Sequence, residues 1–445
     1  MSSRREGRRS FLRMGGAAAL ALSIGDIPAT LGAGRTIADD EIVTIPAMTV
    51  ENISELSADA ADERAWTSLR SLFPLRADRI YLNSGGFGPA SYPVLQARQR
   101  AEVEVAEAGE EQRKRMKSAR ERIAAFLGCD EDELAFTAGT TSAMNLIANG
   151  LVLKADDEIV MSTHEHPGGA MIWVKRAQDI GCRIRLFEPG DSAEATLNAV
   201  QALLTPRTRL VMTSHVTCTT GYRMPVRAIA ALCRTHGCLS VVDGAHPPGM
   251  IPVNLRDLGC DFYAASGHKW LFGPTGTGML FVRRDLLDVW STPLAGAYAD
   301  DSYSLEESRF VAQKKARAVE VGTYNSAAYE ALGAAVELAE NIGIDNIARR
   351  GIFLANFLKQ ELLQIAGLKL LTPLNESDSA SIVTFQVLND AVDPRDLLRV
   401  LSERDGLRLR FVSEHGLNAI RIAPMYCTST ADLQVLIDAL RREVR

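Results

Sequence analysis

The feature of this chain that most constrains its fold is a series of short, apolar, strand-like runs separated by segments of helical periodicity. The runs occupy residues 133–137, 158–162, 183–187, 209–214, 239–243, 262–266 and 278–282. Most of the gaps have the apolar spacing of a helix, for example residues 142–153, 168–180 and 226–236. Strands that alternate with helices predict an α/β fold with a mainly parallel, seven-stranded sheet covered on both faces. Because such sheets bind ligands beyond the carboxyl ends of their strands, the residues after each strand are the first candidates for a site.

The length of 445 residues is enough for two or three cores. Residues 39–75 read as a polar leader and a first helix, and residues 76–330 as a large domain that opens with a strand over 79–83. A long helix predicted over 326–362 bridges to a smaller α+β domain, so that 331–445 hold the interdomain helix and this domain. Its predicted strands are 381–388, 407–412 and 419–422, and its predicted helices are 394–403 and 430–442.

The composition is that of an ordinary soluble globular protein, with 23% charged and 47% hydrophobic residues and a formal net charge of −6. No run of like charge predicts a nucleic-acid tail, a disordered acidic segment or a coiled coil. The expected partners are therefore small molecules or a second copy of the chain.

The first 38 residues have the layout of a signal peptide, with a basic start, a short apolar run over 14–24 and small residues after it. The apolar run is about half as long as the roughly 20 residues of a spanning helix, which disfavours a permanent anchor. Residues 8–13 (RRSFLR) resemble the twin-arginine motif that directs folded proteins to the twin-arginine export machinery. The expected location is the periplasm; cleavage after Ala33 or Ala38 stays open, and a basic tail is the alternative.

The seven cysteines show no paired C-x-x-C spacing and no histidine at zinc-ligand distance. A chain that folds before export does so among reduced thiols, which disfavours disulfides. Most of these cysteines are therefore expected to be buried small hydrophobic residues.

A lysine lies in the glycine-rich loop 267–278 (GHKWLFGPTGTG), directly after the strand that ends at Ser266. A lysine beside glycines is usually a surface residue, but the apolar flanks predict that Lys269 is partly buried. Burial lowers the pKa of a lysine toward the neutral amine that forms an imine. His268 next to it has a core position as its alternative.

Asp243 ends another strand, at the edge where a parallel sheet exposes its ligand crevice. A carboxylate there suits pyridoxal phosphate (PLP), because an anion beside the pyridine nitrogen keeps the ring protonated and electron-withdrawing. The alternative for Asp243 is a helix cap. His246, three residues on, has two readings: a hydrogen bond to the phenolic oxygen of that ring, or simple packing.

A glycine and three hydroxyl residues, Gly139 to Ser142, follow the first strand of the series and open an apolar helix. The free N–H groups and positive dipole of a helix start favour a phosphate. An ordinary N-cap would use one hydroxyl, so the run that includes Thr140 and Thr141 favours the anion site.

Together these segments resemble the class V aminotransferase family, PLP enzymes of fold type I that include cysteine desulfurases and isopenicillin N epimerases. The resemblance covers about residues 75–440. It implies that Lys269 carries PLP as a Schiff base, that Asp243 binds the ring nitrogen and that Thr140 and Thr141 bind the phosphate. It also gives His246 and His268 places at the cofactor, His246 standing where desulfurases commonly have glutamine.

The resemblance implies further roles outside these motifs. His166 would stack on the cofactor ring as a catalytic residue, and Ser214 with His215 would orient the phosphate and the ring. Thr323 would reach the phosphate of a neighbouring subunit, which makes the active unit a homodimer. Arg421 would grip the substrate carboxylate, since its planar fork suits bidentate recognition.

Asn83 lies in the segment 81–89, which is closest to the epimerase branch and adds a substrate-binding candidate. One departure from the family bears on the reaction. Residues 410–418, the loop where desulfurases carry their persulfide cysteine, contain no cysteine, and Cys427 lies too late in the chain to replace it. Sulfur transfer by a cysteine nucleophile is therefore disfavoured.

The expected function is that of an exported PLP enzyme acting on the amino group of an amino acid or amine, by transamination. The reason is proton traffic: Lys269 is one base, and moving a proton on one face of the cofactor needs only one. Epimerisation, the second choice, normally needs a donor on the other face, for which only Tyr81 or His166 are candidates. A β-lyase is the third choice, and a PLP-binding protein without catalysis is disfavoured by Arg421.

Overall fold

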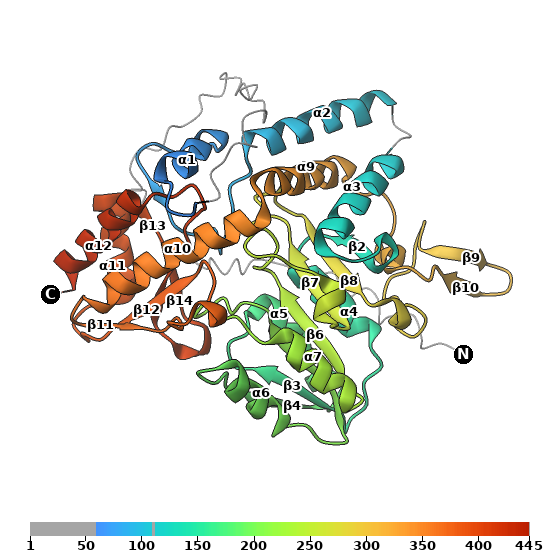
Figure 1. Ribbon diagram of the computed structural model, residues 1–445. Helices are drawn as coiled ribbons and strands as arrows, with labels where there is room; N and C mark the ends of the chain where they lie inside the picture. Colours follow the sequence, from blue (N-terminus) through green and yellow to red (C-terminus); the bar gives the residue numbers. More distant parts are fainter. Residues whose placement is uncertain (1–58, 109–111, 445) are drawn as a thin grey trace, which may run out of the picture. The chain divides into compact units, whose positions relative to one another are not determined.

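The structure is a computed structural model, and it describes residues 59–108 and 112–444. The described residues belong to one compact unit (Figure 1). The twin-arginine segment and most of the leader lie outside the described residues. Among the residues described, no helix is both long and apolar enough to cross a membrane.

The predicted α/β fold is confirmed by a seven-stranded sheet of strand order β2-β8-β7-β6-β5-β3-β4. Each predicted strand is present within one residue of its expected bounds. The strands are β2 Leu134–Thr137, β3 Glu158–Ser162, β4 Arg183–Phe187, β5 Thr208–Ser214, β6 Leu239–Gly244, β7 Phe262–Ser266 and β8 Gly278–Val282. Only β8 runs against the others, pairing antiparallel with β7 and β2. The loop 267–277 is too short for the helical crossover that a parallel partner requires.

Helices cover both faces of this sheet, because the strands carry apolar side chains on both faces. Val160 and Phe281 belong to one buried cluster, whereas their neighbours Ile159 and Leu280 belong to another. The second cluster takes in α4 Thr140–Gly150 and α5 Pro167–Ile180. The first takes in the remaining covering helices, α2 Tyr92–Ala108, α3 Gln112–Leu127, α7 Val226–Thr235 and α9 Ser326–Ile342.

The single long helix expected over 326–362 is wrong: the chain forms two helices, α9 and α10 Ile344–Leu363, which change direction at Gly343. Gly343 has φ 88°, a conformation that glycine adopts without steric cost. Leu354, Leu358 and Leu362 of α10 then pack into the core of the C-terminal part.

The C-terminal part contains a four-stranded antiparallel sheet of order β11-β12-β15-β14. Its elements are β11 Leu368–Leu370, β12 Val383–Val387, β14 Arg410–Val412, β15 Ala419–Ile422 and the helices α11 Pro394–Asp405 and α12 Thr430–Glu443. The strand expected over 407–412 is split, because β13 Leu407–Arg408 instead pairs in parallel with β1 Ile80–Tyr81. The first strand of the predicted large domain therefore pairs with the C-terminal part, and the domain boundaries stay a prediction.

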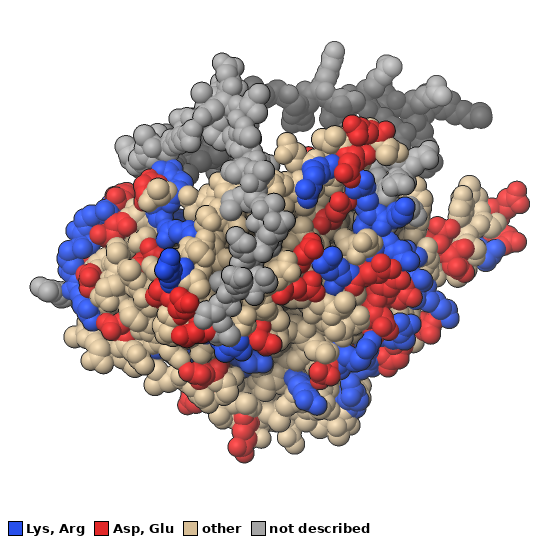
Figure 2. Space-filling view, turned by 45° about the horizontal axis from the view of Figure 1, so that its top comes forward, with Lys and Arg blue, Asp and Glu red and all other residues tan. Residues whose placement is uncertain are grey.

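The helix expected within residues 39–75 is present as the short helix α1 Glu63–Ser68, whereas a hairpin of β9 Asp300–Ser304 and β10 Arg309–Ala312 was not expected from the sequence. All seven cysteines are free, and six are buried, which confirms the expected unpaired hydrophobic role. On the face shown in Figure 2, acidic and basic side chains are interspersed, in line with the small net charge.

Candidate active site

A cavity of about 620 Å³ lies at the carboxyl ends of the central strands. The segments after β2, β3 and β7, the ends of β5 and β6, and two arginines of the C-terminal sheet form its wall. Of the predicted site residues, the cavity is lined by Thr140, Thr141, His166, Ser214, Asp243, His246, His268, Lys269 and Arg421. The β-strand termini thus bring together segments nearly 300 residues apart in the chain.

Lys269 lies in the turn after β7 and its side chain is of intermediate exposure, facing the cavity. Removal from bulk water lowers the pKa of its amine to about 8, an effect that Asp243 opposes and Arg421 reinforces. At pH 7 about a tenth of this amine is therefore neutral, and the neutral share reaches one half near pH 8. That state is the one in which a lysine acts as a nucleophile or a base.

Asp243 is buried in β6, and its Oδ1 accepts a hydrogen bond of 2.9 Å from the backbone N–H of Ala245. Burial raises the pKa of its carboxyl group, against the attraction of Lys269. Helix α5 can approach this carboxylate because residue 169 is glycine: a Cβ there would lie 2.5 Å from Asp243 Oδ2. The bond to Ala245 stays within the turn after β6, so this contact does not make Asp243 a helix cap.

Glu165 and His166 follow β3, and His166 lines the cavity. His166 is the N-cap of α5, its Nδ1 accepting from the N–H of Gly168 at 3.0 Å. Burial, with help from Lys269 and Arg410, lowers the pKa of His166 to about 4, so its ring is neutral.

The buried Glu165 bridges to β5, accepting from the N–H and the hydroxyl of Ser214 at 2.8 and 2.6 Å. Burial raises the pKa of Glu165 to about 8. No role was predicted for Glu165, because nothing in a Glu-His pair distinguishes a buried carboxyl group from an exposed one.

The start of α4 forms the end of the cavity that is suited to bind an anion. Its N-cap Gly139 makes no side-chain cap, and Thr140 instead bonds Ser266 Oγ through its hydroxyl at 2.8 Å and its N–H at 3.3 Å. The ordinary single-hydroxyl cap is therefore not present. The residues of this first turn, Thr140 to Ser142, line the cavity, so the positive end of the helix dipole lies at its wall, where it favours a phosphate.

The structure separates the predicted pair Ser214 and His215. Ser214 lines the cavity, whereas His215 Nδ1 lies 3.0 Å from the hydroxyl of Tyr263 and its ring is not part of the cavity wall. Successive residues of an extended chain point to opposite sides, so the two side chains cannot share one ligand. His246 is buried, accepts from Trp270 Nε1 at 3.1 Å, and leaves its Nε2 without a partner.

Arg421 is 1% exposed and lines the cavity. Its Nη1 donates to Cys218 O at 2.9 Å, its Nη2 to Asn83 Oδ1 at 3.3 Å, and its Nε has no partner. Burial and the nearby Arg410 lower the pKa of its guanidinium to about 10. Asn83 thus acts on the site through Arg421. Arg410, which also lines the cavity, received no role from the sequence.

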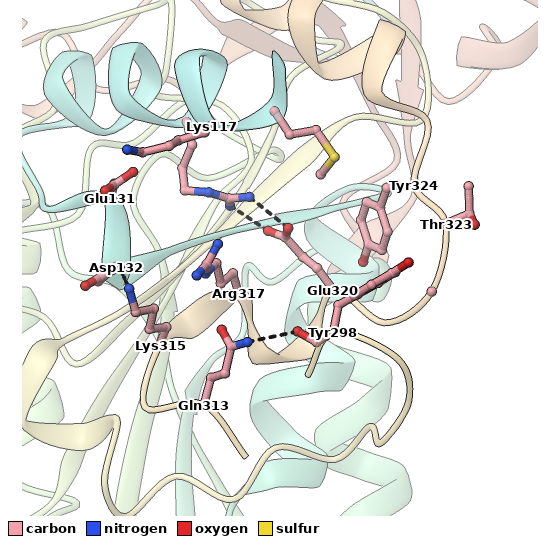
Figure 3. Close-up of a pocket in the computed structure, with 13 residues that line it drawn as sticks. Lys117, Glu131, Asp132, Tyr298, Gln313, Lys315, Arg317, Glu320, Thr323 and Tyr324 are labelled. Atoms are coloured by element: carbon pink, nitrogen blue, oxygen red, sulfur yellow. Dashed lines mark hydrogen bonds and ion pairs between the residues drawn. The ribbon is translucent and has the colours of Figure 1, made fainter. Parts of the chain in front are cut away.

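Thr323 lies elsewhere, in a second cavity of about 650 Å³ between α3 and the segment 313–324 (Figure 3). A buried ion pair between Arg120 and Glu320 forms part of its wall, with Nη–Oε distances of 2.6 and 2.8 Å. Within one subunit, Thr323 is therefore not part of the wall around Lys269.

The residues of the first cavity fit pyridoxal phosphate. A helix start without a side-chain cap suits the phosphate, Asp243 suits the ring nitrogen, and Lys269 lies among the same wall residues. The buried Nε2 of His246 and Nε of Arg421 lack partners within the described protein, as expected of atoms that contact a ligand.

Comparison with known proteins agrees with this geometry. Residues 94–423 match the model of the family "Aminotransferase class-V", and the chain belongs to this family. The protein is accordingly a PLP-dependent enzyme of class V. It is 30% identical to isopenicillin N epimerase of Amycolatopsis lactamdurans over 391 residues, covering 85% of this chain and 98% of the relative.

A second epimerase and a C-S lyase are also similar to this chain. The isopenicillin N epimerase of Streptomyces clavuligerus is 33% identical over 331 residues, covering 72% of this chain and 83% of its own. Among solved structures, the cystine C-S lyase C-DES in complex with cysteine persulfide is 27% identical, with a TM-score of 0.75 over 84% of this chain and all of its own. The family, the fold and the cofactor predicted from the sequence are confirmed, and the reaction is left to be proposed.

Proposed function

We propose that the protein transfers the amino group of an α-amino acid that binds through its carboxylate at Arg421. The observation that carries this proposal is the pairing of one cavity-facing amine, Lys269, with a buried arginine in the same cavity. When bound, pyridoxal phosphate supplies an aldehyde that takes up the amino group and a ring that withdraws electrons from Cα.

Arg421 supplies the orientation of the substrate. Its guanidinium is held by Cys218 O and Asn83, two neutral acceptors that fix its position without cancelling its charge. A carboxylate that binds there gains charge-assisted hydrogen bonds in a site largely shielded from water. The amino group of the substrate is thereby directed toward the Lys269 side of the cavity.

Lys269 supplies the movement of the proton. With its pKa lowered to about 8, the amine can take a proton from Cα of the substrate and hold it on one face. The two candidates for a second carrier are poorly placed for that task. The ring of His166 is neutral, and its Nδ1 already accepts a hydrogen bond from the N–H of Gly168. The hydroxyl of Tyr81 donates a hydrogen bond to Phe87 O. Proton transfer on one face favours transamination.

Epimerisation is the second candidate, because two relatives that match most of the chain are named isopenicillin N epimerases. The cavity also contains the Cys218 thiol, whose pKa burial raises to about 11, so that it stays protonated. A protonated thiol is a possible second donor. A β-lyase reaction is a third candidate, supported by the similarity to the C-S lyase.

The reactions are distinguished by incubating the holoenzyme with L- and D-amino acids in deuterated buffer, with and without keto acids. Transamination predicts a keto acid product that requires an acceptor, and deuterium at Cα without inversion. Inversion at Cα without keto acid would transfer the proposal to epimerisation, and release of ammonia without an acceptor would indicate elimination. Lys269→Ala, which should keep the fold, is the matched control.

We also propose that the protein is exported by the twin-arginine machinery to the periplasm and works as a homodimer. The support for export is the sequence of residues 8–13. The support for the dimer is the position of Thr323 outside the cavity of its own subunit, which leaves it available to a neighbouring one. Sedimentation of the holoenzyme, with Thr323→Ala tested for cofactor retention, would check the second point.

A further inference from the structure

Two arginines face each other across the strands that close the substrate end of the cavity. Arg410 of β14 and Arg421 of β15 are register partners in the antiparallel pair, so their side chains lie on the same face of the sheet. Both line the cavity. Like charges in this arrangement destabilise a sheet unless an anion compensates them.

Among the residues that the structure describes, one of these two charges has a partner of opposite charge. Arg410 forms an ion pair with Glu414 through Nη2, whereas the acceptors of Arg421 in the described residues are neutral. Two guanidinium groups and one carboxylate leave one positive charge. A single carboxylate from outside would make the group neutral.

The unused hydrogen-bond donors are one on each arginine. Arg410 Nη1 and Arg421 Nε are both buried and have no partner within the described protein. A buried donor without an acceptor destabilises the protein, and more so when the group is charged. If the ion pair of Arg410 with Glu414 were purely structural, it would account for the position of Nη2, but it would not account for a buried Nη1 that has no acceptor.

We propose that Arg410 and Arg421 form a two-arginine clamp on one carboxylate of the substrate, and that Glu414 is a positioning residue that holds Arg410. The clamp rests on the proposed function, in that the carboxylate is the one next to the amino group that reacts. The clamp also limits the substrate class to amino acids with a single carboxylate near it. The one positive charge left by the two arginines and Glu414 is balanced by the first carboxylate, so a second acidic group would have no positive charge of the clamp to balance it.

Binding of simple carboxylates to the holoenzyme tests the clamp without any turnover. Butyrate, butyramide and glutarate are titrated by calorimetry into the wild type, Arg410→Gln, Arg421→Gln and the double variant. Each single variant should bind butyrate about 10- to 100-fold more weakly, since a hydrogen bond to a charged group contributes about 1.5–3 kcal/mol. The double variant should lose less than the product of the two single losses, because both arginines contact one anion.

Two further variants separate the roles. Glu414→Gln should weaken butyrate binding less than Arg410→Gln, and it should not alter butyramide binding. Arg408→Gln, an exposed arginine on the adjacent β13, should change neither. Circular dichroism of every variant checks that the fold is kept.

Butyrate binding by Arg410→Gln within twofold of the wild type would overturn the clamp, as would an equal loss for butyramide. If glutarate bound tenfold more tightly than butyrate, the proposal that both arginines bind one carboxylate would be overturned, and Arg410 would be assigned to the binding of a second acidic group. If the clamp is confirmed and no amino acid is converted, the proposed function fails while the carboxylate site stands.

Discussion

The buried ion pair beside Thr323 allows a quantitative prediction for Glu320→Gln. Glu320 is 9% exposed and accepts three hydrogen bonds: Arg120 Nη1 at 2.6 Å, Arg120 Nη2 at 2.8 Å and Phe136 N–H at 2.6 Å. Glutamine keeps two acceptor contacts at best, with its amide N–H groups facing Nη2, and it leaves Arg120 buried without a counter-charge. Removing one partner of a buried pair costs about 3–5 kcal/mol.

The expected shift in melting temperature follows from the size of the compact unit. Unfolding entropy is about 2.1 cal/mol/K per residue, so roughly 380 ordered residues give about 0.8 kcal/mol/K. A loss of 3–5 kcal/mol should then lower the Tm of the holoenzyme by about 4–6 °C, measured by circular dichroism at one scan rate. Glu121→Gln, which removes an exposed pair with Lys117 on the same helix as Arg120, should shift it by less than 1 °C. Equal small shifts for both variants would refute the reasoning.

Four further outcomes are expected. Lys269→Ala should abolish the covalent cofactor link and keep the fold; borohydride reduction and peptide mapping of the wild type should find the label on Lys269 and on no other lysine. The rate of cofactor attachment to the apoenzyme should rise with pH, reach half its maximum near pH 8 and level off about one to two pH units above that, because the neutral amine reacts and its pKa is about 8; a rate that still rises steeply at pH 10 would contradict the lowered pKa. Gly169→Ala, whose Cβ would lie 2.5 Å from a carboxylate oxygen, should weaken cofactor retention several-fold, whereas Gly333→Ala, with 3.6 Å to its nearest neighbour, should not. Replacing both arginines at positions 8 and 9 by lysine should leave the protein in the cytoplasm, as measured by cell fractionation. Unimpaired export of this variant would reject the twin-arginine motif.

The large sheet was predictable because its strands are short apolar runs whose local pattern has one interpretation. The motifs after those strands were predictable for the same reason: the ends of β2, β6 and β7 meet at one edge, which brings Thr140, Asp243 and Lys269 to one cavity. The break at Gly343 was visible as a glycine within a helical pattern. Its consequence was not, since a glycine within a helix is often tolerated.

What the sequence could not show depends on pairing between distant segments. The register of β14 on β15 sets Arg410 opposite Arg421, and nothing local to either strand indicates that register. The role of Glu165 depends on its contact with Ser214, about 50 positions along the chain. The orientation of His215 toward Tyr263 depends on which side of β5 meets the cavity, which a family motif alone does not specify.

The pairing of β1 with β13 has a consequence for how the enzyme is made. Ile80 pairs with Leu407, and Asn83 forms a bridge with Ala423 beside the substrate arginine, so this wall of the cavity joins segments more than 300 residues apart. Such contacts form late, because a long loop must close before they contribute. On the ribosome, the sheet that positions Lys269 and the phosphate-binding start of α4 can assemble before the C-terminal strands have been synthesised. The nascent enzyme therefore has the parts to hold its cofactor before it has the parts to recognise a substrate.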